Sequence, residues 1–187
     1  MSGTQLYHGT DTLFDDIQII GHSSPFRDFG EGFYLTSFFS QASSQTQRKS
    51  RRNTRQRIAN PAYVYKYEVQ YFEQNNYRIL ELLQYNEDWL NFLKYNRLHG
   101  GKEREASEEW QNLDIVYDRM ADNRLNVIIN DLRSYARREI DIAEVISHLA
   151  RDKDWDQYCF KTERALKLLT RIEVIDVSRQ YPNIEQD

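Results

Sequence analysis

Alternation of hydrophobic and polar residues predicts β-strands in several segments of the chain. The clearest segment is 62–71, which is rich in Tyr and Val and separates into two faces. One face would carry Val64, Lys66 and Glu68, and the other Tyr63, Tyr65, Tyr67 and Val69. Shorter strands are predicted over residues 5–9, 33–37, 113–117, 157–161 and 172–177.

Apolar residues at spacings of three and four predict helices between these strands. Asn86 is a good N-cap for one of them, and Gly100 is suited to close it. Thr162 is likewise placed to cap a short helix. The expected helices are 40–57, 87–99, two within 124–151, and one from Thr162 through Leu169.

This order of elements predicts an α+β fold, in which helices surround a small antiparallel or mixed sheet. With 187 residues and no low-complexity linker, residues 1–187 are expected to form a single domain. Apolar residues make up 40% of the chain, and 13 Tyr and 9 Phe provide many aromatic anchors. This composition argues against a disordered chain.

The cysteine and histidine positions and the N-terminal sequence bear on the cellular compartment and on metal binding. Cys159 is the one cysteine, so it can form no internal disulfide, and it lacks the spaced Cys and His partners of a zinc site. His22, His99 and His148 share no metal-ligand spacing. The chain begins without a signal-peptide pattern, and no run approaches the ~18 apolar residues of a membrane span. We therefore expect a cytoplasmic protein with no bound metal and no membrane association.

Three short segments combine reactive or aromatic side chains with strand positions. Tyr7-His8-Gly9-Thr10 ends the first predicted strand, and Gly30-Glu31-Gly32-Phe33-Tyr34 places two glycines directly before an aromatic strand. Asp156-Gln157-Tyr158-Cys159-Phe160 alternates near the C-terminus. Each is weak alone, because a strand histidine is usually structural and Gly-x-Gly is usually a turn. Their order and contexts carry the information.

Together the three segments resemble the ADP-ribosyltransferase superfamily, in the His-Tyr-Glu branch shared by diphtheria-type toxins and poly-ADP-ribose polymerases. Residues 30–35 are similar to that branch's Gly-Lys-Gly-Ile-Tyr-Phe segment, and residues 7–9 to its His-Gly strand. Most of the chain also resembles an uncharacterised bacterial family that is placed in this superfamily. The resemblance implies a split antiparallel or mixed β-sheet core with surrounding helices, and NAD+ as co-substrate without a metal.

The resemblance also implies roles for individual residues. His8 would donate a hydrogen bond to the adenosine ribose, and the backbone of Gly9 would pair with the nicotinamide carboxamide. Tyr34 would stack on the nicotinamide ring, an interaction of roughly 0.5–1.5 kcal/mol beyond area burial. The implied catalytic residues are His8, Tyr34 and Gln157, and the implied NAD+ contacts are Tyr7, His8, Gly9, Thr10, Gly32, Phe33 and Tyr34.

The third signature position departs from the branch, because Gln157 stands where Glu is usual. Glutamine can bind a ribose hydroxyl but carries no charge, and losing one preorganised electrostatic contact can cost about 3–4 kcal/mol of transition-state stabilisation. Polymer synthesis is therefore less favoured than single transfer or hydrolysis. Glu163 is a rival carboxylate, although its place at the start of a predicted helix gives it an ordinary helix-stabilising role.

The resemblance implies a mono-ADP-ribosyltransferase that acts on a macromolecular acceptor, protein or nucleic acid, as the toxin of a toxin-antitoxin pair with a protein antitoxin. Two alternatives stay open: a non-catalytic module that binds NAD+ or ADP-ribose, and an NAD+ glycohydrolase.

The net charge of −4 hides a basic run, because no Asp or Glu lies between Glu31 and Glu68. The run consists of Arg48, Lys49, Arg51, Arg52, Arg55 and Arg57. On a helix, four of these arginines would form one stripe. It could meet a nucleic-acid acceptor, the NAD+ pyrophosphate or an acidic partner, or be a plain solvated face.

Overall fold

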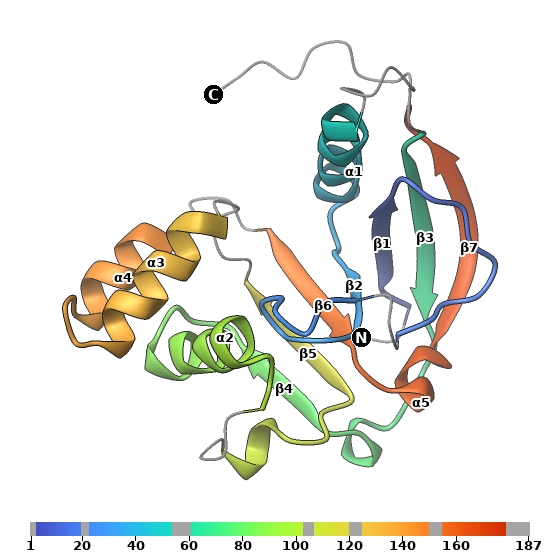
Figure 1. The fold of residues 1–187 in the computed structure, drawn as a ribbon. Helices are drawn as coiled ribbons and strands as arrows, with labels where there is room; N and C mark the ends of the chain where they lie inside the picture. Colours follow the sequence, from blue (N-terminus) through green and yellow to red (C-terminus); the bar gives the residue numbers. More distant parts are fainter. Residues whose placement is uncertain are drawn as a thin grey trace. The chain divides into compact units, whose positions relative to one another are not determined.

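The computed structural model describes residues 3–19, 23–53, 61–102, 107–119, 125–149 and 155–178 (Figure 1). The chain divides into two compact units, each assembled from separate stretches of sequence. The first contains residues 1–17, 35–72 and 167–187, and the second contains residues 18–34 and 73–166. A single domain over residues 1–187 stays a prediction.

A three-stranded antiparallel sheet forms the centre of the first unit. Its strands are β1 (Gln5–Thr10), β3 (Tyr63–Val69) and β7 (Leu169–Asp176), in the order β1-β3-β7. Helix α1 (Phe39–Asn53) covers one face of this sheet (Figure 1). The core beneath the helix contains Ala42, Ala62, Val64 and Val177, with Tyr7, Phe39 and Ile175 packed against it.

The strand alternation predicted for β3 is confirmed. Val64 faces α1, while Tyr65 and Tyr67 stack on each other on the opposite face, with ring centroids 6.4 Å apart. Register pairs His8 of β1 with Tyr65, so the His8 side chain also lies on the face opposite α1.

The second unit contains a mixed four-stranded sheet in the order β2-β6-β5-β4. Its strands are β2 (Phe33–Leu35, whose last residue belongs to the first unit), β4 (Ile79–Leu82), β5 (Ile115–Arg119) and β6 (Asp156–Phe160). β5 runs parallel to β4 and antiparallel to β6. Because parallel neighbours need a crossover, the chain passes through α2 (Glu87–His99) between β4 and β5.

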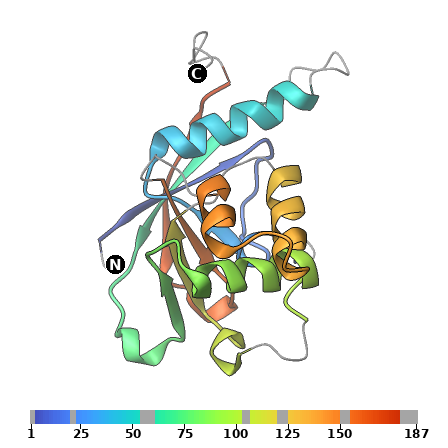
Figure 2. The same ribbon diagram turned by 90° about the vertical axis from the view of Figure 1, so that its left-hand side faces the viewer.

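Helices α2, α3 (Leu125–Ala136) and α4 (Ile142–Leu149) gather on one side of this sheet, as Figure 2 shows. They share one hydrophobic core with the sheet, in which Trp89, Leu132 and Leu149 of the helices pack with Val116 and Cys159 of the strands. Two 3₁₀ turns, η2 (Gln74–Asn76) and η3 (Glu108–Trp110), lie on the connections around β4 and β5. Within the described ranges, no helix is long and apolar enough to cross a membrane.

The predicted α+β class is confirmed, with one antiparallel and one mixed sheet. The caps of α2 are also confirmed: the Asn86 side chain accepts a hydrogen bond from the Trp89 N–H, and Gly100 closes the helix in the left-handed conformation. The helix expected from Thr162 through Leu169 is too long. α5 covers only Glu163–Leu166, because Leu169 already pairs with Val69 as the first residue of β7. β4 was not predicted.

Candidate functional site

The first signature segment lies on β1, at an edge of the first unit's sheet. The backbone N–H of Tyr7 donates to the Thr36 carbonyl at 2.8 Å, and the Thr36 N–H donates back to Tyr7 at 3.0 Å. In an antiparallel strand, backbone groups of alternate residues point to the same edge. The N–H and C=O of Gly9 therefore point to the edge that Tyr7 uses, away from β3.

The absence of a side chain at Gly9 has a packing reason in this structure. A Cβ at this position would collide with the carbonyl oxygen of Ala42 and would lie 3.3 Å from the Cβ of Thr46. Tyr7 packs edge-on against Phe39, with ring centroids 5.6 Å apart. The carbonyl of Thr10 accepts a hydrogen bond from the Thr46 hydroxyl at 2.6 Å. Gly9 thus lets α1 approach β1 closely.

His8 contacts a loop that is fixed to its sheet. Its ring meets Phe14 edge-on, with centroids 5.9 Å apart, and Phe14 stacks on Tyr65 at 4.2 Å. The Tyr65 hydroxyl accepts from the Phe14 N–H at 2.7 Å and donates to the Phe14 carbonyl at 3.0 Å. Arg171 donates to the carbonyls of Phe14 and Asp15, both at 3.1 Å. This loop restricts where the imidazole can turn.

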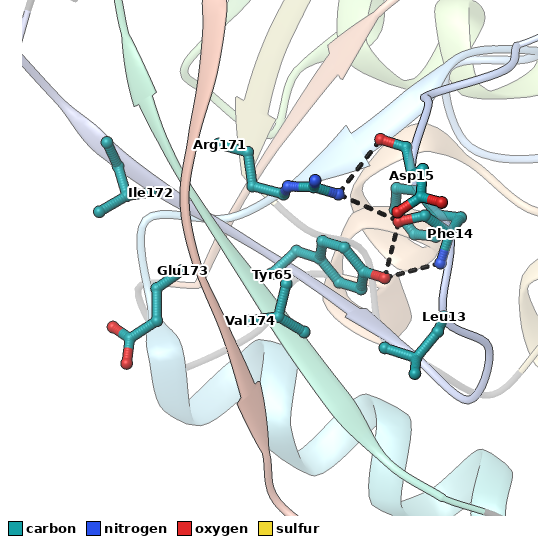
Figure 3. A pocket seen from close by; sticks show the side chains of 8 residues that line it. All are labelled: Leu13, Phe14, Asp15, Tyr65, Arg171, Ile172, Glu173 and Val174. Atoms are coloured by element: carbon teal, nitrogen blue, oxygen red, sulfur yellow. Dashed lines mark hydrogen bonds between the residues drawn. The ribbon is translucent and has the colours of Figure 1, made fainter.

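A hollow of about 320 Å³ lies beside this loop (Figure 3). It is lined by residues 13–15, by Tyr65 and by residues 171–174. The guanidinium of Arg171 points to the loop carbonyls. None of the predicted site residues lines this hollow.

The second signature segment forms the loop before β2 in the second unit. A Cβ at Gly32 would collide with the Sγ atom of Cys159 and would lie 3.0 Å from the Phe160 carbonyl oxygen. The glycine therefore allows the loop to lie directly against β6. Phe33 is buried, and its place next to Tyr34 in β2 turns it to the opposite face of the sheet.

Two long, positively charged side chains bind this loop. The ammonium of Lys161, which directly follows β6, donates to the carbonyls of Phe29 and Glu31. Arg97 of α2 forms an ion pair with the buried Asp28 at 2.7 Å and also donates to the Phe26 carbonyl at 3.0 Å. The loop that leads into Tyr34 is therefore tied to both β6 and α2.

The Tyr34 side chain is buried and forms hydrogen bonds with backbone groups of the same loop. Its hydroxyl accepts from the Phe29 N–H at 3.2 Å and donates to the Gly30 carbonyl at 2.5 Å. Burial raises the pKa of Tyr34 well above its usual value. The Phe29 ring stacks with it at a centroid distance of 6.0 Å, and the Arg27 guanidinium lies over the ring at 5.1 Å. The planar Arg27 guanidinium thus already lies over the Tyr34 ring, which is expected to stack on nicotinamide.

The third signature segment is β6, the neighbour of β2 in the sheet. Cys159 is fully buried against Tyr34, and burial raises the pKa of its thiol to about 11. This confirms its interpretation as a small buried side chain. Gln157 is two residues earlier and lies on the same face. Its Oε1 atom is buried without a hydrogen-bond partner among the described residues. Tyr34 and Gln157 therefore share one face of neighbouring strands.

One acidic residue beside this position was missed. Register pairs Gln157 directly with Asp118 of β5, so the two side chains lie on the same face, and Asp118 is only 1% exposed. The sequence contains no local signal for this, because the two residues become neighbours only through strand pairing.

The remaining candidates lie elsewhere. Glu163 is exposed in the first turn of α5, where its charge suits the helix N-terminus. His99 is exposed at the end of α2, and His148 pairs with Asp131 at 3.2 Å. In the part of the chain that the structure describes, no group of His, Cys, Asp and Glu could hold a metal ion. Of the basic run, Arg48 and Lys49 are exposed on α1; Arg55 and Arg57, like His22, lie outside the described residues.

Comparisons with known proteins identify a family but no relative of known activity. No curated protein and no solved structure matches the chain. A family described as "Protein of unknown function (DUF3990)" matches residues 4–170. This match confirms the expected resemblance to an uncharacterised family. Because it spans most of the sequence, the chain belongs to the DUF3990 family.

Proposed function

We propose that this protein is a mono-ADP-ribosyltransferase that uses NAD+ to modify a macromolecular acceptor. The observation that supports the proposal most is the position of Tyr34 and Gln157. They are far apart in the sequence, yet they lie on neighbouring strands and on one face. An aromatic ring and an amide on one face of neighbouring strands suit a nicotinamide riboside, because the ring can stack on the base while the amide binds a ribose hydroxyl.

The backbone of Gly9 adds a second argument. Its N–H and C=O point away from β3, to the edge of β1 on which Tyr7 pairs with Thr36, and a carboxamide carries one acceptor oxygen and donor hydrogens that would complement them. The role of His8 at the adenosine ribose rests on the resemblance to His-Tyr-Glu enzymes. Its ring is held by Phe14, which gives a hydrogen-bond donor a defined orientation.

The reaction breaks the bond between ribose C1 and the nicotinamide nitrogen, and the bonding electrons leave with nicotinamide. The positively charged, oxocarbenium-like C1 then bonds to a nucleophile of the acceptor, which loses a proton. Gln157 would hold a hydroxyl of the nicotinamide ribose, and Tyr34 would orient the leaving ring. With water as nucleophile, the same steps give NAD+ hydrolysis.

The test is incubation of the pure protein with NAD+ labelled in its adenylate half. The proposal expects release of free nicotinamide, and in a cell lysate it expects label on a macromolecule. Gln157→Ala should lower the rate of nicotinamide release strongly. Gln70→Ala is the matched control, because Gln70 is an exposed glutamine in the other unit. Nicotinamide release without labelled macromolecule would indicate a glycohydrolase, and NAD+ binding without release would indicate a binding module.

A toxin role is a separate part of the proposal and has its own test. Expression of the wild-type protein should arrest bacterial growth, while Gln157→Ala should not. A protein antitoxin would then restore growth and co-purify with the wild-type chain. Arrest by both variants would show that growth inhibition does not depend on NAD+ chemistry.

A further inference from the structure

Asp118 and Gln157 form a cross-strand pair in the centre of the second unit's sheet. Asp118 of β5 lies opposite Gln157 of β6, between the pairs Tyr117↔Tyr158 and Arg119↔Asp156. Residues that lie directly opposite in an antiparallel ladder point to the same face, with Cβ atoms about 4.5–5.5 Å apart. The Asp118 carboxylate therefore lies on the same face as the Gln157 amide, whereas Asp156 of the same ladder points to the opposite face.

The surroundings of the pair make the charge of Asp118 effective. Asp118 is 1% exposed, and Val116 and Cys159, also on this face, are fully buried. Tyr117 and Tyr158 stack on the opposite face, with centroids 4.3 Å apart. A carboxylate this well shielded from solvent is screened weakly by water, so its charge acts on nearby groups more strongly than that of a surface carboxylate would.

We infer that Asp118 is a positioning residue that supplies, through Gln157, the negative charge that the third signature position lacks. This inference rests on the proposed function. An ionised carboxylate only accepts hydrogen bonds, so an ionised Asp118 would favour the amide orientation in which Nε2 of Gln157 faces it. The Oε1 atom, which has no partner among the described residues, is then left to accept a hydrogen bond from the nicotinamide ribose. Positive charge that develops at C1 would be stabilised by the same carboxylate.

The experiment uses variants that move the carboxylate from position 118 on β5 to position 157 on β6. Nicotinamide release is measured for the wild type, Asp118→Asn, Gln157→Glu and the double variant Asp118→Asn/Gln157→Glu, with thermal unfolding and NAD+ binding measured on each. Asp118→Asn should lower kcat by about 10²-fold, the cost of losing one preorganised electrostatic contact. KM for NAD+ should change much less, because the ring and ribose contacts remain.

The double variant decides between a structural and an electrostatic role. It restores one carboxylate to the pair, so it should recover most of the lost kcat. Gln157→Glu alone places two carboxylates opposite each other, which is destabilising, and it should turn over more slowly than the double variant. This comparison stays informative even where Asp118→Asn fails to fold.

Three outcomes would overturn the inference. A folded Asp118→Asn variant with wild-type kcat would show that the charge is not used. A folded double variant without recovery would show that the loss was structural. Faster turnover by Gln157→Glu than by the double variant would assign the charge to position 157 alone. A folded wild type that releases no nicotinamide would instead contradict the proposed function, and the inference with it.

Discussion

The Sγ atom of Cys159 fills the space directly beside the α-carbon of Gly32, so β6 and the loop before β2 leave no room for a side chain there. This contact joins the second and third signature segments. It also explains why the glycine immediately precedes the strand that carries Tyr34.

Gly32→Ala should therefore lower the free energy of unfolding by about 1–3 kcal/mol through overpacking. Cys159→Ala removes one of the two clashing atoms, so the double variant Gly32→Ala/Cys159→Ala should be more stable than the sum of the single effects predicts, by ~1 kcal/mol. The Phe160 carbonyl remains close, and the rescue should be partial. Urea unfolding of all four proteins measures this coupling. Strict additivity would contradict the contact.

Tyr34→Phe separates the structural role of this residue from its binding role. The substitution removes the hydroxyl that serves the Phe29 N–H and the Gly30 carbonyl, at a cost of ~1–3 kcal/mol in unfolding free energy. It keeps the ring, so the NAD+ dissociation constant should stay within about 2-fold. Tyr34→Leu also removes the stacking, and roughly 2- to 10-fold weaker binding is expected.

Titration calorimetry with NAD+, at a temperature where both Tyr34 variants are folded, makes this comparison. Equal affinities for Tyr34→Phe and Tyr34→Leu would remove the ring from the NAD+ site.

We expect Asp114 to make a contribution to the free energy of unfolding that is lost in acid. Burial alone would raise the pKa of its carboxyl, but hydrogen bonds from Arg164, Thr162 and the Arg78 N–H lower this pKa to about 2. Since the folded pKa lies below the unfolded value near ~3.9, the contribution is complete above about pH 4 and disappears as the pH falls towards about 2. The shift corresponds to about 2 kcal/mol.

Asp114→Asn should thus be less stable than the wild type at pH 7, and the difference should shrink steadily below pH 4. Glu139→Gln is the control, because the Arg137–Glu139 ion pair is exposed and should contribute little. The measurement is the unfolding free energy of the wild type and both variants from pH 2 to 7. A difference between wild type and Asp114→Asn that persists unchanged at pH 2 would be inconsistent with this assignment.

We expect Lys161 to stabilise the loop before β2 locally. Lys161→Met leaves the carbonyls of Phe29 and Glu31 without their donor, which should cost ~1–3 kcal/mol and speed hydrogen exchange of the Gly30 amide. Lys167→Met, on an exposed position after α5, should change stability by less than about 0.5 kcal/mol. Equal exchange rates in the two variants would show that Lys161 does not hold the loop.

Sequence patterns predicted the elements that carry strong local signals. Asn86 and Gly100 bracket α2 because capping depends on a few adjacent residues. β3 was predicted because its alternating faces are both well populated, by Val64 on one side and Tyr65 on the other. These signals are local, and so they could be read without knowing the fold.

The remaining features depend on pairing between distant segments. β7 is mostly exposed and is separated from the end of α5 by two residues, so its apolar alternation is weak and its start was misplaced. β4 is four residues long and is defined by its parallel pairing with β5. The neighbourhood of Asp118 and Gln157 likewise follows from register alone. Motif order brought His8, Tyr34 and Gln157 forward as site residues, but it could not supply the acidic partner.

The most direct test of the account is the release of nicotinamide from NAD+ by the pure, folded protein, followed by chromatography. We expect steady release that falls strongly in Gln157→Ala and is unchanged in Gln70→Ala. No release from folded wild-type protein, or release that is equal in all three proteins, would contradict it.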